Sequence, residues 1–342
     1  MTRPRLVFLL LLSSLASLHA AEYVGADACT PCHSAEAAKQ STTHHAHALH
    51  RIAGSTVGDF LLEQARSPDG ALHYTADGQN VHVSGPWTDE NPIIEWAFGA
   101  AVQGSTPVGH LGEQYFEHRF SYYSRIHALA PTFGHPRRVS APLAELGMLQ
   151  DPQTITSCFN CHGTGVQRGP NGPDLAAYSP GVRCERCHGP GSSHIQAATQ
   201  HAAAAAIDRQ IVNPGRLPAK ALIEICGQCH RLPTVEMGAE PELENPITVR
   251  FAPVGLLASR CFNGSRGKLS CLTCHDPHAD AQPRTAMSYT EKCLACHAAS
   301  KQPIKLCRRR QRENCLTCHM QQSSLGPYLR FTDHRIRVYS PD

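Results

Sequence analysis

Residues 184–188 read Cys-Glu-Arg-Cys-His, and this spacing of two cysteines followed directly by a histidine occurs seven times in the chain. The seven motifs are Cys29-Cys32-His33, Cys158-Cys161-His162, Cys184-Cys187-His188, Cys226-Cys229-His230, Cys271-Cys274-His275, Cys293-Cys296-His297 and Cys315-Cys318-His319. Two thiols at this spacing can form thioethers with the two vinyl groups of one haem, and the adjacent imidazole then lies under the iron as its proximal ligand. The sequence therefore predicts seven covalently attached haem c groups.

Other uses of paired cysteines explain the pattern less well. Zinc ribbons and dithiol redox proteins also contain such pairs, but neither needs a histidine at this one offset. A disulfide framework would not space its cysteines so uniformly. Two cysteines lie outside the motifs, Cys261 and Cys307, and we expect them to form a disulfide if the chain reaches an oxidising compartment.

Composition excludes several classes of protein. Of 342 residues, 41% are apolar and 17% are charged, which is typical of a folded chain rather than a disordered one. The formal charge of +3 is balanced, and no basic stripe interleaved with aromatic residues predicts nucleic-acid binding. The propionates of seven haems would make the loaded protein anionic, so a partner guided by charge should present a basic face.

The first residues have the pattern of an export signal. Arg3 and Arg5 precede a mostly apolar stretch at residues 6–18, and small residues follow at Ala20 and Ala21. We interpret residues 1–20 as a signal peptide rather than a membrane anchor, because a spanning helix needs about 20 apolar residues. The prediction is an exported, periplasmic protein with no transmembrane segment after signal removal.

The motifs divide the mature chain unevenly. One motif lies in residues 21–150, and six lie in residues 151–342. We expect a multihaem cytochrome c fold in which short α-helices and irregular loops pack around stacked haems. Turn signals and alternating residues predict strands at 71–76, 79–84 and 114–123, so we expect a small β-containing segment over roughly 55–140 that covers the first haem.

The remaining histidines are candidates for the sixth iron ligand. We favour His45, His194, His278 and His334, and less strongly His110, His118, His127 and His135. His278 follows His275 by three residues and His45 follows His33 by twelve, so each should serve a haem other than that of the motif preceding it. Haem held by two histidines has a low potential, whereas methionine ligation would raise it.

Three longer stretches resemble the cytochrome c-552/c-554 superfamily of multihaem cytochromes. They are the opening Tyr23-Val24-Gly25 with Thr43 to Leu49, the segment Gly181 to Gly191 followed by His194, and Leu269 to His278 with the closing Phe331 to Ile336. The resemblance implies periplasmic electron transfer and supports His45, His194, His278 and His334 as distal ligands. The chain departs from the pentahaem nitrite reductases of this superfamily, because no motif ends in lysine instead of histidine.

Three functions remain open on these grounds. The first is an electron carrier that exchanges electrons with redox partner proteins, such as a membrane quinol-oxidising complex or other cytochromes. The second is an oxidoreductase acting on a small nitrogen or sulfur compound, of the nitrite or hydroxylamine type, at one open haem. Tyr115, Tyr122, Tyr123 and Arg119 could line such a site, although strand packing explains them equally well. The third is an assembly module whose haem-rich surfaces dock into a larger complex.

Overall fold

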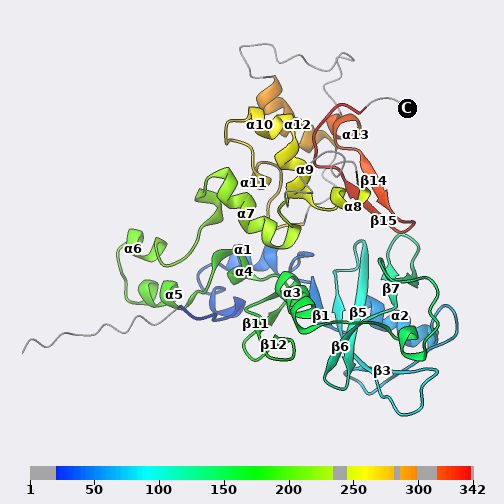
Figure 1. Cartoon of the computed structure of the whole chain (residues 1–342). Helices are drawn as coiled ribbons and strands as arrows, with labels where there is room; N and C mark the ends of the chain where they lie inside the picture. The colour runs from blue at the N-terminus through cyan, green and yellow to red at the C-terminus, as the bar shows by residue number, and fades with distance from the viewer. Residues whose placement is uncertain (1–20, 234–244, 281–285, 299–313, 340–342) are drawn as a thin grey trace, which may run out of the picture.

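The computed structural model describes residues 21–233, 245–280, 286–298 and 314–339 (Figure 1). The predicted signal peptide and Cys307 of the predicted disulfide lie outside these residues. Within the described part of the chain, no helix is long and apolar enough to cross a membrane.

An antiparallel sheet of nine strands occupies residues 49–149. Its main path runs β2-β3-β4-β5-β6-β9, while β1 pairs with β4 and β7 pairs with β5 and β8. The strands are β1 (Leu49–Arg51), β2 (His73–Ala76), β3 (Val81–Ser84), β4 (Ile93–Phe98), β5 (Gly104–Leu111), β6 (Gln114–His118), β7 (Phe120–Tyr123), β8 (Ala128–Pro131) and β9 (Gly147–Leu149).

Local sequence explains the first hairpin and the helix beside it. The turn between β2 and β3 has Gly78 at φ +95°, and Asp77 accepts hydrogen bonds from the backbone amides of Gln79 and Asn80. Helix α2 (Thr56–Gln64) begins at Ser55, whose hydroxyl accepts from the Gly58 amide. The predicted strands at 71–76, 79–84 and 114–123 are thereby confirmed, with the last divided at Arg119.

The sheet has two apolar cores. One lies inside the sheet region and includes Ile52, Leu61 of α2 and Phe116. The other joins the sheet to helix α3 (Pro152–His162), with Trp96 and Phe98 of β4 packed against Phe159. Because α3 carries the second motif, the sheet packs on the second motif. Our prediction that the β-containing segment covers the first haem was therefore wrong.

Short helices dominate the rest of the described chain (Figure 1). They are α1 (Ser34–Gln40), α4 (Cys184–His188), α5 (Ser192–Thr199), α6 (Ala204–Asp208), α7 (Ala219–His230), α8 (Pro246–Val249), α9 (Ala252–Ala258), α10 (Arg260–Gly264), α11 (Cys271–Cys274), α12 (Ala286–His297) and α13 (Cys315–His319), with 3-10 turns η1 (Ala26–Ala28), η2 (Pro142–Glu145) and η3 (Pro214–Arg216). Three two-stranded ribbons pair β10 (Gly163–Thr164) with β13 (Ser179–Pro180), β11 (Gln167–Arg168) with β12 (Pro173–Asp174), and β14 (Gln322–Leu325) with β15 (Leu329–Thr332).

The fold is thus mixed, with short helices and a substantial sheet. The prediction of short helices in the second half is confirmed, but the β-containing segment is larger than we expected. Polar and apolar residues alternate only weakly in several strands between residues 55 and 140. Two further strands of the sheet, β1 and β9, lie outside that range and pair with β4 and β6. Those two pairings are non-local, so a pattern within either strand does not reveal them.

Candidate haem sites

The motifs are numbered 1 to 7 here in chain order, and six of them lie in helical turns. Motifs 2, 3, 4, 6 and 7 end α3, α4, α7, α12 and α13, and motif 5 occupies α11 with His275 just beyond it. Motif 1 forms the turn between η1 and α1. One helical turn places both thiols and the histidine near one another, as attachment to one haem requires.

Four of the motif histidines face a second histidine from a distant part of the chain. The ring centres are 6.3 Å apart for His33 and His194, 6.1 Å for His188 and His278, 6.0 Å for His230 and His45, and 6.3 Å for His275 and His334. The four partners are those that the sequence favoured as distal ligands. Their assignment to motifs 1, 3, 4 and 5 could not be read from spacing.

These separations fit a metal ion between each pair of rings. An iron takes about 2 Å to each imidazole nitrogen, and each nitrogen lies about 1 Å from its ring centre, which gives roughly 6 Å between ring centres. The donors present at these four motifs therefore fit a haem held on both faces.

Hydrogen bonds fix which ring nitrogen is available. Nδ1 donates to a backbone carbonyl in His188 (Val212, 2.9 Å), His194 (Ile207, 3.1 Å) and His334 (Thr332, 2.9 Å). A carbonyl can only accept, so Nδ1 carries the proton and Nε2 keeps its lone pair. His162 and His319 make the same bond, to Ala48 at 2.8 Å and to Arg337 at 2.9 Å.

Burial also favours the neutral imidazole. It lowers the pKa of His45, His162 and His334 below its ordinary value, and the hydrogen bonds to carbonyls oppose this shift only in part. His188 and His230 shift in the same direction for the same first cause. A neutral imidazole is the form that binds a metal.

Thiols from different motifs also lie within hydrogen-bonding reach. Side-chain hydrogen bonds join Cys29 to Cys184, Cys161 to Cys229, Cys226 to Cys271 and Cys293 to Cys315. Cys187 lies near Cys226 and Cys229, and Cys293 lies near Cys274. Taken together, these contacts and close approaches arrange the motifs in the order 1-3-4-5-6-7, with motif 2 joined to motif 4 as a branch.

The less favoured histidines belong to the sheet region. His118 is fully buried, with its Nε2 3.0 Å from the Tyr74 hydroxyl and its Nδ1 accepting from the Phe120 amide. His110 pairs with Glu95, His135 with Glu117, and His127 with the Tyr122 hydroxyl. Among the described residues, none of these four stacks on a motif histidine.

The four sheet residues that could line an open haem fall into two groups, according to whether they approach a motif. Arg119 is buried and pairs with Asp69 and Glu145, while Tyr122 and Tyr123 pack in β7. Only Tyr115 approaches a motif, with its ring centre 5.8 Å from that of Phe159 in motif 2. Strand packing therefore accounts for Arg119, Tyr122 and Tyr123.

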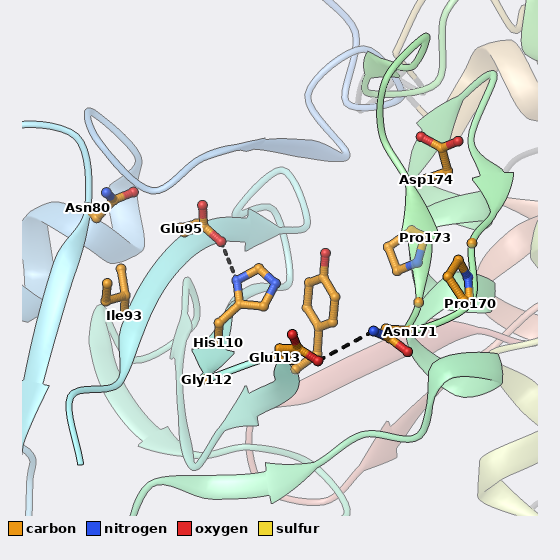
Figure 2. A pocket seen from close by; sticks show the side chains of 13 residues that line it. Asn80, Ile93, Glu95, His110, Gly112, Glu113, Pro170, Asn171, Pro173 and Asp174 are labelled. Carbon is orange, nitrogen blue, oxygen red and sulfur yellow. Dashed lines mark hydrogen bonds and ion pairs between the residues drawn. The ribbon is translucent and has the colours of Figure 1, made fainter. Parts of the chain in front are cut away.

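A pocket of about 650 Å³ lies beside Tyr115, between the sheet and the β11–β12 ribbon (Figure 2). Figure 2 shows Glu95 and His110 joined across β4 and β5, 2.5 Å apart, and Glu113 facing Asn171 of the ribbon. His110 lowers the pKa of Glu95 by donating a hydrogen bond from its Nδ1 to the Glu95 carboxylate, so the two groups satisfy each other.

The paired histidines and the repeated motifs are those of a haem-binding protein, and comparisons with known proteins give related cytochromes. Residues 117–189, which contain motifs 2 and 3, match the family model of cytochrome c554 and c-prime. The outer cell wall cytochrome OcwA has a similar fold, with a TM-score of 0.53 at 17% identity over 92% of this chain and 79% of that one. An undecahaem cytochrome from the S-layer of Carboxydothermus ferrireducens aligns over 81% of this chain and 43% of its own, at 16% identity and a TM-score of 0.41. No curated protein sequence matches.

Residues 117–189 thus resemble the cytochrome c554 and c-prime family, the chain shares its fold with the cytochrome OcwA, and its cysteine–histidine motifs fit haem c as the cofactor. The resemblance to multihaem cytochromes of the c-552/c-554 type that the sequence predicts is thereby confirmed. The family match covers only the junction between the sheet and the first part of the haem-motif region, so the other motifs are identified by their own residues.

Proposed function

We propose that this chain is an exported seven-haem electron relay, in which most haems are held between two histidines. The observation that carries the proposal is the set of four histidine pairs with ring centres 6.0 to 6.3 Å apart. Bound haem supplies a one-electron carrier at each motif. Two histidine ligands restrain the iron in both oxidation states, so little rearrangement accompanies each transfer.

In this proposal each residue set has one role. The fourteen motif cysteines hold the haems, and His33, His162, His188, His230, His275, His297 and His319 bind iron as proximal ligands. His194, His278, His45 and His334 are the distal ligands of motifs 1, 3, 4 and 5 respectively. The rings of His188, His194 and His334 are oriented by the carbonyls of Val212, Ile207 and Thr332 respectively.

The thiol contacts support a continuous path. Each thioether begins at the edge of a porphyrin, so thiols in contact bring two haem edges together. Thiol contacts link motif 1 to 3, 4 to 5 and 6 to 7, and thiols of motif 3 lie near those of motif 4, as thiols of motif 6 lie near those of motif 5. Electrons would enter and leave through redox partner proteins such as other cytochromes or a membrane quinol-oxidising complex. The predicted signal peptide and the cell-wall location named for OcwA support a place outside the cytoplasm.

The test is a haem count by intact mass, with electron paramagnetic resonance of the oxidised protein. We expect seven haems and low-spin signals for at least the four paired sites. His278→Ala should convert one haem to the high-spin form without lowering the count, whereas His73→Ala on the exposed face of β2 should change neither. A wild-type count below seven, or a His278→Ala spectrum identical to that of the wild type, would contradict the proposal.

One observation favours a second candidate function, catalysis at motif 2. Like His297 and His319, His162 faces no histidine ring in the described part of the chain, but it is buried, and the ring it contacts is Phe98, at 5.2 Å between centres. An iron with one protein ligand could bind a small nitrogen or sulfur compound. A high-spin signal of about one haem that shifts on adding nitrite, hydroxylamine or sulfite would favour this candidate. A spectrum with every haem low-spin would exclude it.

A further inference from the structure

The two residues between the cysteines of motif 3 reach three other motifs. Glu185 and Arg186 are adjacent in α4, carry opposite charges and extend to different neighbours. Figure 1 shows α3, α4 and α7 meeting near the middle of the molecule, where motifs 2, 3 and 4 come together. Motif 3 is therefore the junction of the haem-motif region.

Arg186 connects motif 3 to motifs 2 and 4. Its Nε donates to the carbonyl of Asn160 at 3.1 Å, and its Nη1 donates to Oε1 of Gln228 at 2.7 Å. Its Nη2 lies 3.6 Å from the sulfur of Cys229. Asn160 and Gln228 occupy the same place in motifs 2 and 4 that Arg186 occupies in motif 3. All five donors of a guanidinium lie in one plane, so a single side chain can hold several motifs in register.

Glu185 connects motif 3 to the segment that leads into motif 1. The side chain is 3% exposed, and its carboxylate accepts from the backbone amides of Val24 at 2.9 Å, Gly25 at 2.8 Å and Gly191 at 2.8 Å. It also lies near Cys29 of motif 1. These amides satisfy the carboxylate without a cation, so its negative charge stays close to motifs 1 and 3.

We propose that Glu185 and Arg186 set a difference in reduction potential across this junction, which biases electrons from motif 1 toward motifs 2 and 4. Haem iron loses one positive charge when it is reduced. A fixed cation such as Arg186 therefore favours the reduced form, and a fixed anion such as Glu185 favours the oxidised form. Both charges lie in the partly buried junction, where screening by water is weaker than at the surface.

This inference rests on the proposed relay and adds a direction to it. One electron moves in each step: the donor site goes from ferrous to ferric as the acceptor site goes from ferric to ferrous, and no bond is formed or broken. The redox partners supply and remove the electron. Glu185 and Arg186 are not themselves oxidised or reduced; they act through the haems, because their charges shift the reduction potentials.

The test is a spectroelectrochemical titration of the fully loaded protein and three variants. Arg186→Gln should make at least one haem about tenfold harder to reduce, a shift of 59 mV for a one-electron couple. Arg186→Lys retains the charge and should stay close to the wild type. Glu185→Gln should shift a different haem in the opposite direction, making it easier to reduce.

Arg183→Gln is the matched control, since Arg183 precedes the same helix and its Nε donates only to the Pro180 carbonyl. If the Arg186→Gln protein holds seven haems and its reduction potentials equal those of the wild type, this inference is overturned and the proposed relay is left intact. An equal shift in Arg183→Gln would also overturn it. If Arg186→Gln loads fewer haems, the Glu185→Gln titration decides, and an unchanged potential there overturns the inference. A failure of the proposed relay function would be seen in a different measurement, the haem count of the wild-type protein.

Discussion

The sheet region, residues 49–149, and the haem-motif region that begins at α3 are stabilised in different ways. In the sheet region, strand β7 has all four residues buried, and Ile52, Leu61, Ile94 and Phe116 are fully inaccessible. In the haem-motif region, helices α5, α6, α10, α11 and α13 contain no buried residue. The sheet region therefore has an apolar core of its own, whereas these helices have little protein to pack against. Under the proposed function, we expect bound haem to be the partner that these helices pack against.

The largest expected effect follows directly from this difference. A protein made without haem attachment should keep its sheet and lose the helices of the haem-motif region, because isolated helices of 4 to 12 residues are unstable in water. Hydrogen exchange followed by mass spectrometry should show protected amides in β4 and β5 and rapid exchange in α4, α5 and α10 to α13. The loaded protein in the same buffer is the control. Equal protection of α12 in both forms would show that the helices do not depend on haem.

A second prediction concerns the place where the two regions meet. Phe159 lies inside motif 2, is fully buried and contacts Phe98 and Trp96 edge to face at 4.9 and 5.6 Å. Phe159→Ala should lower the free energy of unfolding by about 3–5 kcal/mol and also perturb the haem at motif 2. Urea unfolding followed by circular dichroism gives the first effect, and the haem absorption spectrum gives the second.

Phe116→Ala is the matched control for this prediction. Phe116 is equally buried but belongs to the core inside the sheet region. The Phe116→Ala substitution should lower the free energy of unfolding by a similar amount and leave the haem absorption spectrum unchanged. If both variants perturb the haem equally, the two regions unfold as one unit and the comparison between them fails.

The two regions also differ in how far the sequence predicts them. Haem attachment is a local property, so Cys184, Cys187 and His188 reveal it by spacing alone. The sequence predicts the candidate distal histidines as a set, but the motif histidine that each one faces depends on chain segments far apart, such as His45 and His230. Spacing could exclude a nearby haem for His45 but could not select motif 4.

The sheet shows the opposite limitation. Turn chemistry at Asp77 and Gly78 predicts the β2–β3 hairpin, because that pairing is between neighbours. The pairing of β1 with β4 and the contact with α3 join residues that no short pattern connects. The roles of Glu185 and Arg186 were missed for a similar reason. Their opposite charges were visible, but their partners lie in three other segments.

The effect that is smallest for a single step, a change of one pH unit, is the dependence of the sheet region's stability on pH through His118. Desolvation, with smaller contributions from His135 and Arg119, lowers the pKa of this buried imidazole to about 3. The unfolded chain has the ordinary value near 6.5, so between pH 6.5 and 3 the unfolded state binds the extra proton. Stability is therefore full above pH 6.5 and falls by about 1.4 kcal/mol for each pH unit below it. Hydrogen exchange of β6 and β7 amides across this range measures the slope. His118→Gln should flatten it, since an amide can still bond to Tyr74 but does not titrate, and an unchanged slope in that variant would assign the effect to other groups.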